Sequence, residues 1–332
     1  MGKNGPLVPR IGMGLMGVSA IYGLPAPTPD RLALLDRAYE LGDTFWDTAD
    51  MYGDSEDLLG TWFAANPDKR KDIFLATKFA ERGIVDGKPR IDSTPDYCRE
   101  AIEKSLKRLG LPYVDLYYIH RFDRVTPVEK TMAVMIELKN AGKIRYIGLS
   151  ECSSTTLRRA HAMHPVTAVQ IEYSPITLDI ERNNLLETAR ELGVAIVTYS
   201  PLGRGLLTGH LRKQEDWSKE GDFRRVMPWL NEENFPNNLK MVDELAEIAK
   251  AKGATLTQLV LSWVLAQGDD IFTIPGTTKV GRLEENLGCL KITLSPDEEK
   301  QIRTITSKIQ GPRFGKHGME IAFADTPPLE SS

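Results

Sequence analysis

The sequence has few cysteines and no extended apolar run, and each shortage argues against a class of protein. Its 332 residues include three cysteines, none in a C-x-x-C pair, which argues against a disulfide framework and a zinc knuckle. No stretch approaches the roughly eighteen consecutive apolar residues of a membrane-spanning helix. The start, Met1 to Pro6, lacks the apolar segment of a signal peptide. We therefore expect a cytosolic protein with reduced thiols.

Positive charge is also in short supply. The 42 lysines and arginines are outnumbered by 46 acidic residues, and without a long basic stretch a nucleic-acid partner is not expected. His161 and His164 have the spacing of paired metal ligands, but no acidic or thiol partner is near them, so no metal site is expected. With 41% hydrophobic residues the chain is long enough to form one sizeable core.

Short apolar segments alternate with segments of helical period after Gly12. This order is typical of parallel strands joined by crossover helices. Eight such units favour a (β/α)₈ barrel over a doubly wound sheet, and we expect one domain of this type over residues 1–332. The expected strands cover 11–15, 45–47, 73–78, 114–120, 144–150, 168–172, 194–200 and 271–274.

Threonine, proline and glycine mark the ends of the expected helices. Thr28, Thr94 and Thr126 each precede a proline, as N-caps do. Glycines follow the helix ends, as left-handed C-caps do, at Gly42, Gly110, Gly142 and Gly193. The expected helices cover 30–41, 55–65, 95–109, 127–141, 153–163, 182–192, 239–250 and 257–266.

Two stretches exceed a minimal barrel. Residues 201–238, after the seventh strand, have little periodicity but carry Trp217, Phe223, Trp229 and Phe235, which favours a folded lid over a disordered linker. Residues 311–332 follow the last expected helix, and we expect this tail to fold over the barrel mouth.

Ionisable residues stand where the first strands end. Asp47, Lys78 and His120 each close an apolar run, and Tyr52 follows Asp47 by five residues. In a barrel of parallel strands, these positions meet at the catalytic mouth. Singly, each has an ordinary structural explanation, such as a loop aromatic or a surface cation. Jointly, they predict a catalytic site.

The four side chains suit carbonyl reduction. Tyr52 would donate a proton, and a neighbouring Lys78 ammonium, held by Asp47, would lower the pKa of the phenol. His120 would donate a second hydrogen bond to the carbonyl oxygen, which stabilises the alkoxide that hydride attack creates. The hydride must come from a reduced nicotinamide cofactor.

Two segments are candidates for binding that cofactor. Residues 12–17 match G-x-G-x-x-G, but Gly23, Pro25, Pro27 and Pro29 follow instead of a helix, so we interpret the match as a glycine-rich strand and loop. Residues 274–286 place glycine and two threonines just before a helix start, which suits an anion. Lys279 and Arg282 add charge for a 2′-phosphate, which favours NADPH over NADH.

Taken together, these residues resemble the aldo-keto reductase superfamily over about Leu7 to Gln310. The most specific stretches are Asp47 to Gly53, Ala76 to Lys78, Tyr118 to Arg121, Gln170 to Pro175, Tyr199 to Gly209 and Ile274 to Asn286. The likeness implies a (β/α)₈ fold in which Tyr52 is the acid, Lys78 and Asp47 tune it, and His120 orients the carbonyl. The tail and long loop look like a microbial and plant branch that includes pyridoxal reductases and reductases of natural-product aldehydes.

The resemblance also implies the cofactor residues. Ser150 and Gln170 would hold the nicotinamide amide, with Glu151 where many relatives carry asparagine, and Tyr199 would stack on the ring. Gly276 stands where many relatives carry a lysine, so phosphate charge must come from Lys279 and Arg282. The remaining expected contacts are Ser200, Pro201, Leu202, Gly203, Arg204, Gly205, Ile274, Thr277, Thr278, Glu285 and Asn286.

The hypothesis is NADPH-dependent reduction of a small aldehyde or ketone, with no membrane or nucleic-acid partner. Two alternatives stay open: Schiff-base chemistry at Lys78, and an NADPH-binding sensor or accessory subunit with weak reductase activity. The expected substrate wall comes from the mouth loops and comprises Ile21, Tyr22, Phe79, Phe122, Trp229 and Phe314.

Overall fold

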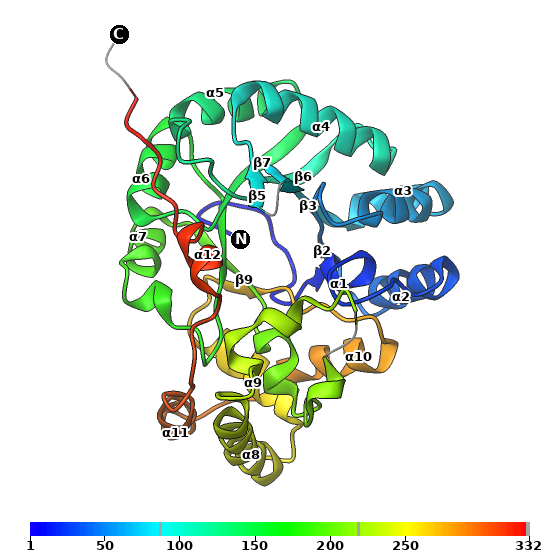
Figure 1. Ribbon diagram of the computed structural model, residues 1–332. Coiled ribbons are helices and arrows are strands. Elements are labelled where there is room, and N and C mark those ends of the chain that lie inside the picture. The colour runs from blue at the N-terminus through cyan, green and yellow to red at the C-terminus, as the bar shows by residue number, and fades with distance from the viewer. Residues whose placement is uncertain (86–87, 218–219, 330–332) are drawn as a thin grey trace.

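The computed structural model describes residues 1–85, 88–217 and 220–329, and an eight-stranded parallel barrel lies at its centre (Figure 1). Two parallel bridges, Ile11 to Thr273 and Gly14 to Gly276, join the first and last strands. The predicted barrel and its eight strands are confirmed. In order around the barrel they are β1 (Met13–Gly14), β2 (Phe45–Asp47), β3 (Phe74–Phe79), β6 (Val114–Ile119), β7 (Ile144–Ser150), β8 (Ala168–Glu172), β9 (Ala195–Tyr199) and β10 (Ile271–Thr273).

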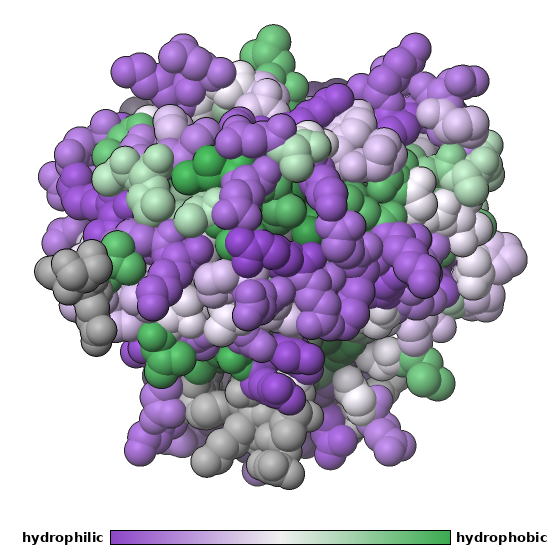
Figure 2. Space-filling model, turned by 90° about the horizontal axis from the view of Figure 1, so that it is seen from above, coloured by the Kyte–Doolittle hydropathy of each residue, from purple (hydrophilic) through white to green (hydrophobic). Residues whose placement is uncertain are grey.

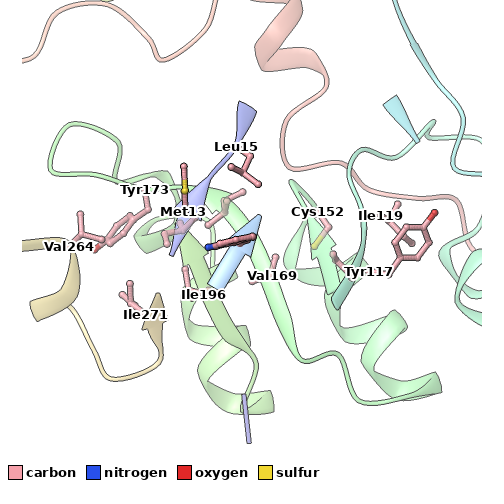
Figure 3. Close-up of a cluster of buried hydrophobic side chains, with 14 of the residues drawn as sticks. Met13, Leu15, Tyr117, Ile119, Cys152, Val169, Tyr173, Ile196, Val264 and Ile271 are labelled. Atoms are coloured by element: carbon pink, nitrogen blue, oxygen red, sulfur yellow. The ribbon is translucent and has the colours of Figure 1, made fainter. Parts of the chain in front are cut away.

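Successive residues of each strand face alternately into and out of the barrel, because a strand has a period of two. On β3, Phe74 and Ala76 belong to the interior cluster, and Leu75 and Phe79 belong to the larger cluster under the helices. Figure 3 shows part of that outer cluster, with side chains from several strands. The same alternation brings Lys78 to the interior at the carboxyl end of its strand.

The barrel interior is apolar toward the amino ends of the strands. Phe45, Leu116 and Ala168 lie there, and Met1 joins the same cluster. The Lys3 amide donates a 2.7 Å hydrogen bond to the Gly193 carbonyl, just before β9. The amino-terminal segment therefore closes the bottom of the barrel, and the polar groups gather at the opposite end.

Helices form the outer ring (Figure 1). The predicted bounds of α3 and α4 agree with the structure, whereas α1, α11 and α12 were not predicted, and α1 lies where a loop was expected. The helices are α1 (Met16–Ser19), α2 (Thr28–Glu40), α3 (Ser55–Ala65), α4 (Pro95–Leu109), α5 (Val128–Asn140), α6 (Ser154–Met163), α7 (Leu185–Leu192), α8 (Phe235–Ala251), α9 (Leu256–Ala266), α10 (Val280–Gly288), α11 (Pro296–Thr306) and α12 (Lys316–Glu320).

The predicted helix caps are partly correct. The Thr94 hydroxyl accepts a hydrogen bond from the Tyr97 amide at 3.3 Å, as an N-cap does. The prediction is wrong for Thr28, which already lies inside α2, and for Thr126, whose hydroxyl donates to Asp123 at 2.8 Å instead. The C-cap glycines are confirmed by left-handed φ values of 64° to 78° at Gly42, Gly110, Gly142 and Gly193.

Additions to the barrel occur on its carboxyl side. A hairpin of β4 (Glu81–Val85) and β5 (Lys88–Ile91), absent from the sequence prediction, follows β3. The long connection after β9 folds into 3-10 turns, and both Trp217 and Trp229 in it are buried. Its residues 218–219 lie outside the described part, and α8 begins at Phe235, earlier than predicted. The 3-10 turns are Gly203–Thr208, Gln214–Asp216, Phe223–Val226 and Pro228–Leu230.

The surface is mixed in polarity. Seen from above, hydrophilic residues cover most of the molecule, and hydrophobic residues gather in a band across the middle (Figure 2). Within the described residues, none of the helices is both long and apolar enough to cross a membrane.

Candidate active site

The four predicted catalytic side chains meet at the carboxyl end of the barrel. Lys78 Nζ donates hydrogen bonds to Asp47 Oδ1, to the Thr48 carbonyl at 2.8 Å and to the Tyr52 hydroxyl oxygen at 3.3 Å. The His120 ring lies edge-on to the Tyr52 ring, with 5.8 Å between the ring centroids. Exposure of the four residues ranges from 0% for Lys78 to 7% for Tyr52. The ammonium, the carboxylate, the phenol and the imidazole thus share one poorly hydrated site.

The contacts of Lys78 determine where the Tyr52 proton points. An ammonium has three protons, and Lys78 has three acceptors for them. Because the Tyr52 oxygen accepts from Lys78, its own O–H is directed elsewhere. Burial lowers the pKa of Lys78 from its ordinary value, and the Asp47 carboxylate opposes that shift. The pair keeps a positive charge beside the phenol oxygen.

The environment of Tyr52 contradicts one expectation. Burial raises the pKa of Tyr52 well above its ordinary value, and the charges of Asp47 and Glu81 raise it further. The predicted lowering of the Tyr52 pKa is therefore wrong, because burial of the phenol is the largest influence and the Asp47 charge adds to it. Burial also lowers the pKa of His120 well below its ordinary value, helped by Lys78 and Arg121. At neutral pH both the phenol and the imidazole are uncharged.

The residues predicted to bind the nicotinamide end of the cofactor lie beside the four catalytic side chains. Ser150 and Gln170 are in register on β7 and β8, and Gln170 Nε2 donates to Asp47 Oδ2 at 2.7 Å. The Ser150 hydroxyl is buried and has no hydrogen-bond partner within the described part of the chain. Tyr199, at the end of β9, donates from its hydroxyl to Glu151 Oε1 at 2.7 Å. The arrangement leaves the Ser150 hydroxyl orphaned beside Gln170.

Two acidic and two basic side chains form a buried network next to Ser150. Arg313 donates from Nη1 and Nη2 to the two carboxylate oxygens of Glu151, each at 2.9 Å. Arg313 also lies 3.4 Å from Glu172, which pairs with Arg204 at 3.3 Å. Burial by itself would raise the pKa of Glu151, but Arg313, Arg121 and the Tyr199 hydroxyl hold it at about 2. Glu151 is therefore a carboxylate at neutral pH.

Arg313 reaches this network from the C-terminal tail, whose described residues run along one side of the barrel and in front of α6 (Figure 1). The Ala324 amide donates to the Glu151 carbonyl at 2.8 Å. Arg159 on α6 donates to the carbonyls of Thr326 and Pro327, both at 2.7 Å. These contacts hold the tail next to the site.

Strained backbone collects at the same end of the barrel. Ala80, Glu151 and Ser200 each follow a strand immediately and have positive φ values of 96°, 49° and 49°. Arg204, in the next turn, has a φ of 55°. Non-glycine residues seldom adopt this conformation, and where they do they concentrate at functional sites.

The segment predicted for the adenosine end lies between β10 and α10. The Thr277 hydroxyl accepts from the Lys279 amide at 3.1 Å, and Lys279 and Arg282 are exposed to solvent. A side chain at Gly276 would place its Cβ 2.9 Å from the Gly14 carbonyl, so close packing of β1 favours glycine there. The other predicted contacts lie in the turn after β9 and around α10: Pro201, Leu202, Gly203, Gly205, Ile274, Thr278, Glu285 and Asn286.

Three residues of the expected substrate wall are buried in the apolar cluster under the helices, to which Phe314 of the same wall also belongs. Phe79 points to the helices because it follows inward-facing Lys78 by one residue, and its ring stacks on Tyr117 with 5.1 Å between centroids. Phe122 is buried in the same cluster. Trp229 is also in that cluster and donates from Nε1 to the Gly311 carbonyl at 3.0 Å. The Phe79 side chain faces away from the site, so that part of the prediction is wrong, and for Phe122 and Trp229 it stays a prediction.

The other three expected wall residues lie at the mouth. The Ile21 carbonyl accepts from the Phe223 amide at 3.0 Å, and Tyr22 forms an antiparallel bridge with Asp222. Phe314 lies under the Arg204 guanidinium, 4.9 Å from ring centroid to Cζ. The loop after β1, the long loop and the tail therefore meet around the opening.

Sequence reasoning missed Glu81, which helps to raise the pKa of Tyr52, and three further charged residues of the site. Glu172 follows Gln170 by two residues, so strand alternation was a usable signal for it. Arg121 directly follows His120 and influences the pKa of His120 and Glu151. Arg313 gave no signal, because it lies 162 residues from Glu151 along the chain.

Residues 10–307 match the Aldo/keto reductase family. The chain is 48% identical over 329 residues to "Aldo-keto reductase yakc [NADP(+)]" of Schizosaccharomyces pombe, covering 97% of this chain and 96% of that protein. It is also 48% identical over 330 residues to "Aldo-keto reductase str7" of Strobilurus tenacellus, with the same coverage of both proteins.

Solved structures agree with this relationship. The thermostable aldo-keto reductase Tm1743, crystallised with the inhibitor epalrestat, superimposes with a TM-score of 0.74 at 30% identity over 92% of this chain and 97% of its own. The glycerol dehydrogenase AKR11B4 from Gluconobacter oxydans shares the fold, with a TM-score of 0.81 at 24% identity over 100% of this chain and 97% of its own. This chain belongs to the aldo/keto reductase family.

Proposed function

We propose that this protein reduces an aldehyde or ketone to the alcohol with NADPH, and that Tyr52 is the general acid. The observation that carries the proposal is the hydrogen bond from buried Lys78 to the Tyr52 oxygen, with Asp47 on the other side of the ammonium. The yakc relative is named for NADP(+), which supports the choice of cofactor.

Tyr52 and His120 would act together on the carbonyl oxygen. The Tyr52 proton is free of Lys78, and a neutral His120 offers a ring N–H. Two donors converging on one oxygen stabilise the negative charge that develops there, and Tyr52 then transfers its proton to it. Bound NADPH would supply the hydride to the carbonyl carbon.

Lys78 and Asp47 would stabilise the phenolate that remains. The ammonium lies 3.3 Å from the Tyr52 oxygen, so it stabilises negative charge as that charge develops on the oxygen. Gln170 donates to Asp47 and helps to hold it. The ion pair keeps Lys78 protonated, which disfavours the Schiff-base alternative, because imine formation requires a neutral amine.

The chain has groups suited to both ends of the cofactor. The orphaned Ser150 hydroxyl and the Gln170 amide would bind the nicotinamide carboxamide, and Tyr199 would contact the ring. Exposed Lys279 and Arg282 at the start of α10 would bind the 2′-phosphate. These roles fit the observed placement of each residue.

The pH dependence of the two directions tests the role of Tyr52. Reduction needs the neutral phenol and oxidation needs the phenolate. Because burial raises the pKa of Tyr52, the neutral form predominates throughout the neutral range. We expect the reduction rate to stay level there and the rate of alcohol oxidation to rise toward alkaline pH.

The measurement is kcat in both directions across pH, with a panel of aromatic, aliphatic and pyridoxal-type aldehydes and the corresponding alcohols. Parallel pH profiles in the two directions would contradict Tyr52 as the proton carrier. Tight NADPH binding without reduction of any aldehyde would favour the sensor or accessory-subunit alternative.

Removing the charge of Arg282 should weaken the binding of NADPH without weakening the binding of NADH. The Arg282→Gln change is expected to raise the Kd for NADPH by about tenfold, the loss of one charge-assisted contact, and to leave the Kd for NADH unchanged. Fluorescence titration with each cofactor measures both constants. Arg99→Gln, at an exposed arginine paired with Glu137 on α5, is the matched control. An equal loss of affinity for both cofactors would show that Arg282 does not contact the 2′-phosphate.

A further inference from the structure

Glu151 places a buried carboxylate next to Ser150, at the proposed nicotinamide end of the cofactor site. Its exposure is 0%, and its pKa of about 2 keeps it charged. The nicotinamide ring carries one more positive charge in NADP⁺ than in NADPH. A fixed charge at this end therefore discriminates between the two forms of the cofactor.

We propose that the ion pair between Glu151 and Arg313 balances the charge at this end, so that Arg313 sets the relative affinity for NADP⁺ and NADPH. The inference rests on the proposed function and adds a positioning role for the C-terminal tail. Arg313 contacts both carboxylate oxygens of Glu151, and the side chains are 2% and 0% exposed. Water and salt screen a buried pair of this kind much less than an exposed one.

The other charged groups nearby leave the charge balance between Glu151 and Arg313 in place. Glu172 pairs with Arg204 at 3.3 Å, and both are buried, so they offset each other. Arg121 adds positive charge that also acts on Glu151, and the Tyr199 hydroxyl donates to it. Of the contacts to Glu151, the one from Arg313 engages both carboxylate oxygens and comes from the tail.

Removing either partner should shift the two affinities in opposite directions. Arg313→Gln leaves an unpaired carboxylate, which favours NADP⁺ over NADPH. Glu151→Gln leaves an unpaired guanidinium, which favours NADPH over NADP⁺. Each change is expected to move the ratio of the two dissociation constants by about tenfold, the effect of a unit charge within about 10 Å at an effective dielectric constant near 20.

The experiment is fluorescence titration of the full chain with NADP⁺ and with NADPH in separate series. Working at about pH 8.5 favours the ionised form of Glu151 after Arg313 is lost. The double variant Glu151→Gln/Arg313→Gln and the charge-keeping variant Arg313→Lys should both stay near the wild-type ratio. Arg159→Gln removes the hydrogen bonds to the Thr326 and Pro327 carbonyls and the ion pair with Glu129, and it leaves the Glu151 carboxylate paired with Arg313, so it should weaken tail docking without changing the ratio.

Opposite shifts in the two single variants support the inference. An unchanged ratio, or shifts in the same direction, would overturn it, because a purely structural role changes both affinities together. A change in Arg159→Gln as large as that in Arg313→Gln would also overturn it. If wild-type protein binds neither cofactor, the proposed function itself fails, which is a separate result from an unchanged ratio.

Discussion

Replacing Tyr52 with phenylalanine is expected to lower kcat for carbonyl reduction by about 10²- to 10⁴-fold, the usual contribution of a positioned general acid. The ring would remain in place, and Lys78 would lose the Tyr52 oxygen but keep its contacts to Asp47 and to the Thr48 carbonyl, so the affinity for NADPH should not change. The measurement combines NADPH consumption with a fluorescence titration of the cofactor.

A second phenol serves as the control for this substitution. Tyr146 lies near the amino end of β7, and its ring packs 6.0 Å from that of Phe74 at the bottom of the barrel. Tyr146→Phe removes the same hydroxyl from a tyrosine far from the mouth and should leave kcat unchanged. A loss of less than about tenfold in Tyr52→Phe would refute the acid role.

The second large effect is expected at Lys78, on stability as well as activity. Lys78→Met leaves the Asp47 carboxylate buried without its cation, and breaking a buried pair in this way costs about 3–5 kcal/mol. Carbonyl reduction should fall as well, because no positive charge then meets the developing phenolate. Urea unfolding gives the stability change, and NADPH consumption gives the activity.

The double variant Lys78→Met/Asp47→Leu distinguishes the loss of stability from the loss of activity. Replacing both charges with apolar groups removes the unpaired carboxylate, so most of the lost stability should return. Activity should stay low, because the ammonium is still absent. If Lys78→Met unfolds within about 1 kcal/mol of wild type, the pair is better hydrated than its burial indicates.

The barrel was predictable because its signals are local and repeated. Each strand is a short apolar run, and each C-cap glycine follows a helix at a fixed place. The strand ends carry Asp47, Lys78 and His120, and the period of two turns all three inward. Their meeting at one end of the barrel therefore followed from the sequence.

Other features depend on contacts that no local pattern records. The pairing of Glu151 with Arg313 joins β7 to the tail, and 162 residues separate the two along the chain. The raised pKa of Tyr52 depends on burial and on the Asp47 charge, neither of which the residue types alone reveal. Phe79 differs, because strand alternation alone turns it away from the site that its neighbour Lys78 faces.

The inward and outward alternation also restricts where the chain tolerates insertions and deletions. Removing one residue within β3 before Lys78 would turn the ammonium toward the helices and Phe79 into the barrel. The hairpin of β4 and β5 adds residues after Lys78, where the register has already been set. Insertions and deletions in the loops beyond the strand ends are therefore compatible with the chemistry of the site. Loss of a single residue within a strand would abolish that chemistry.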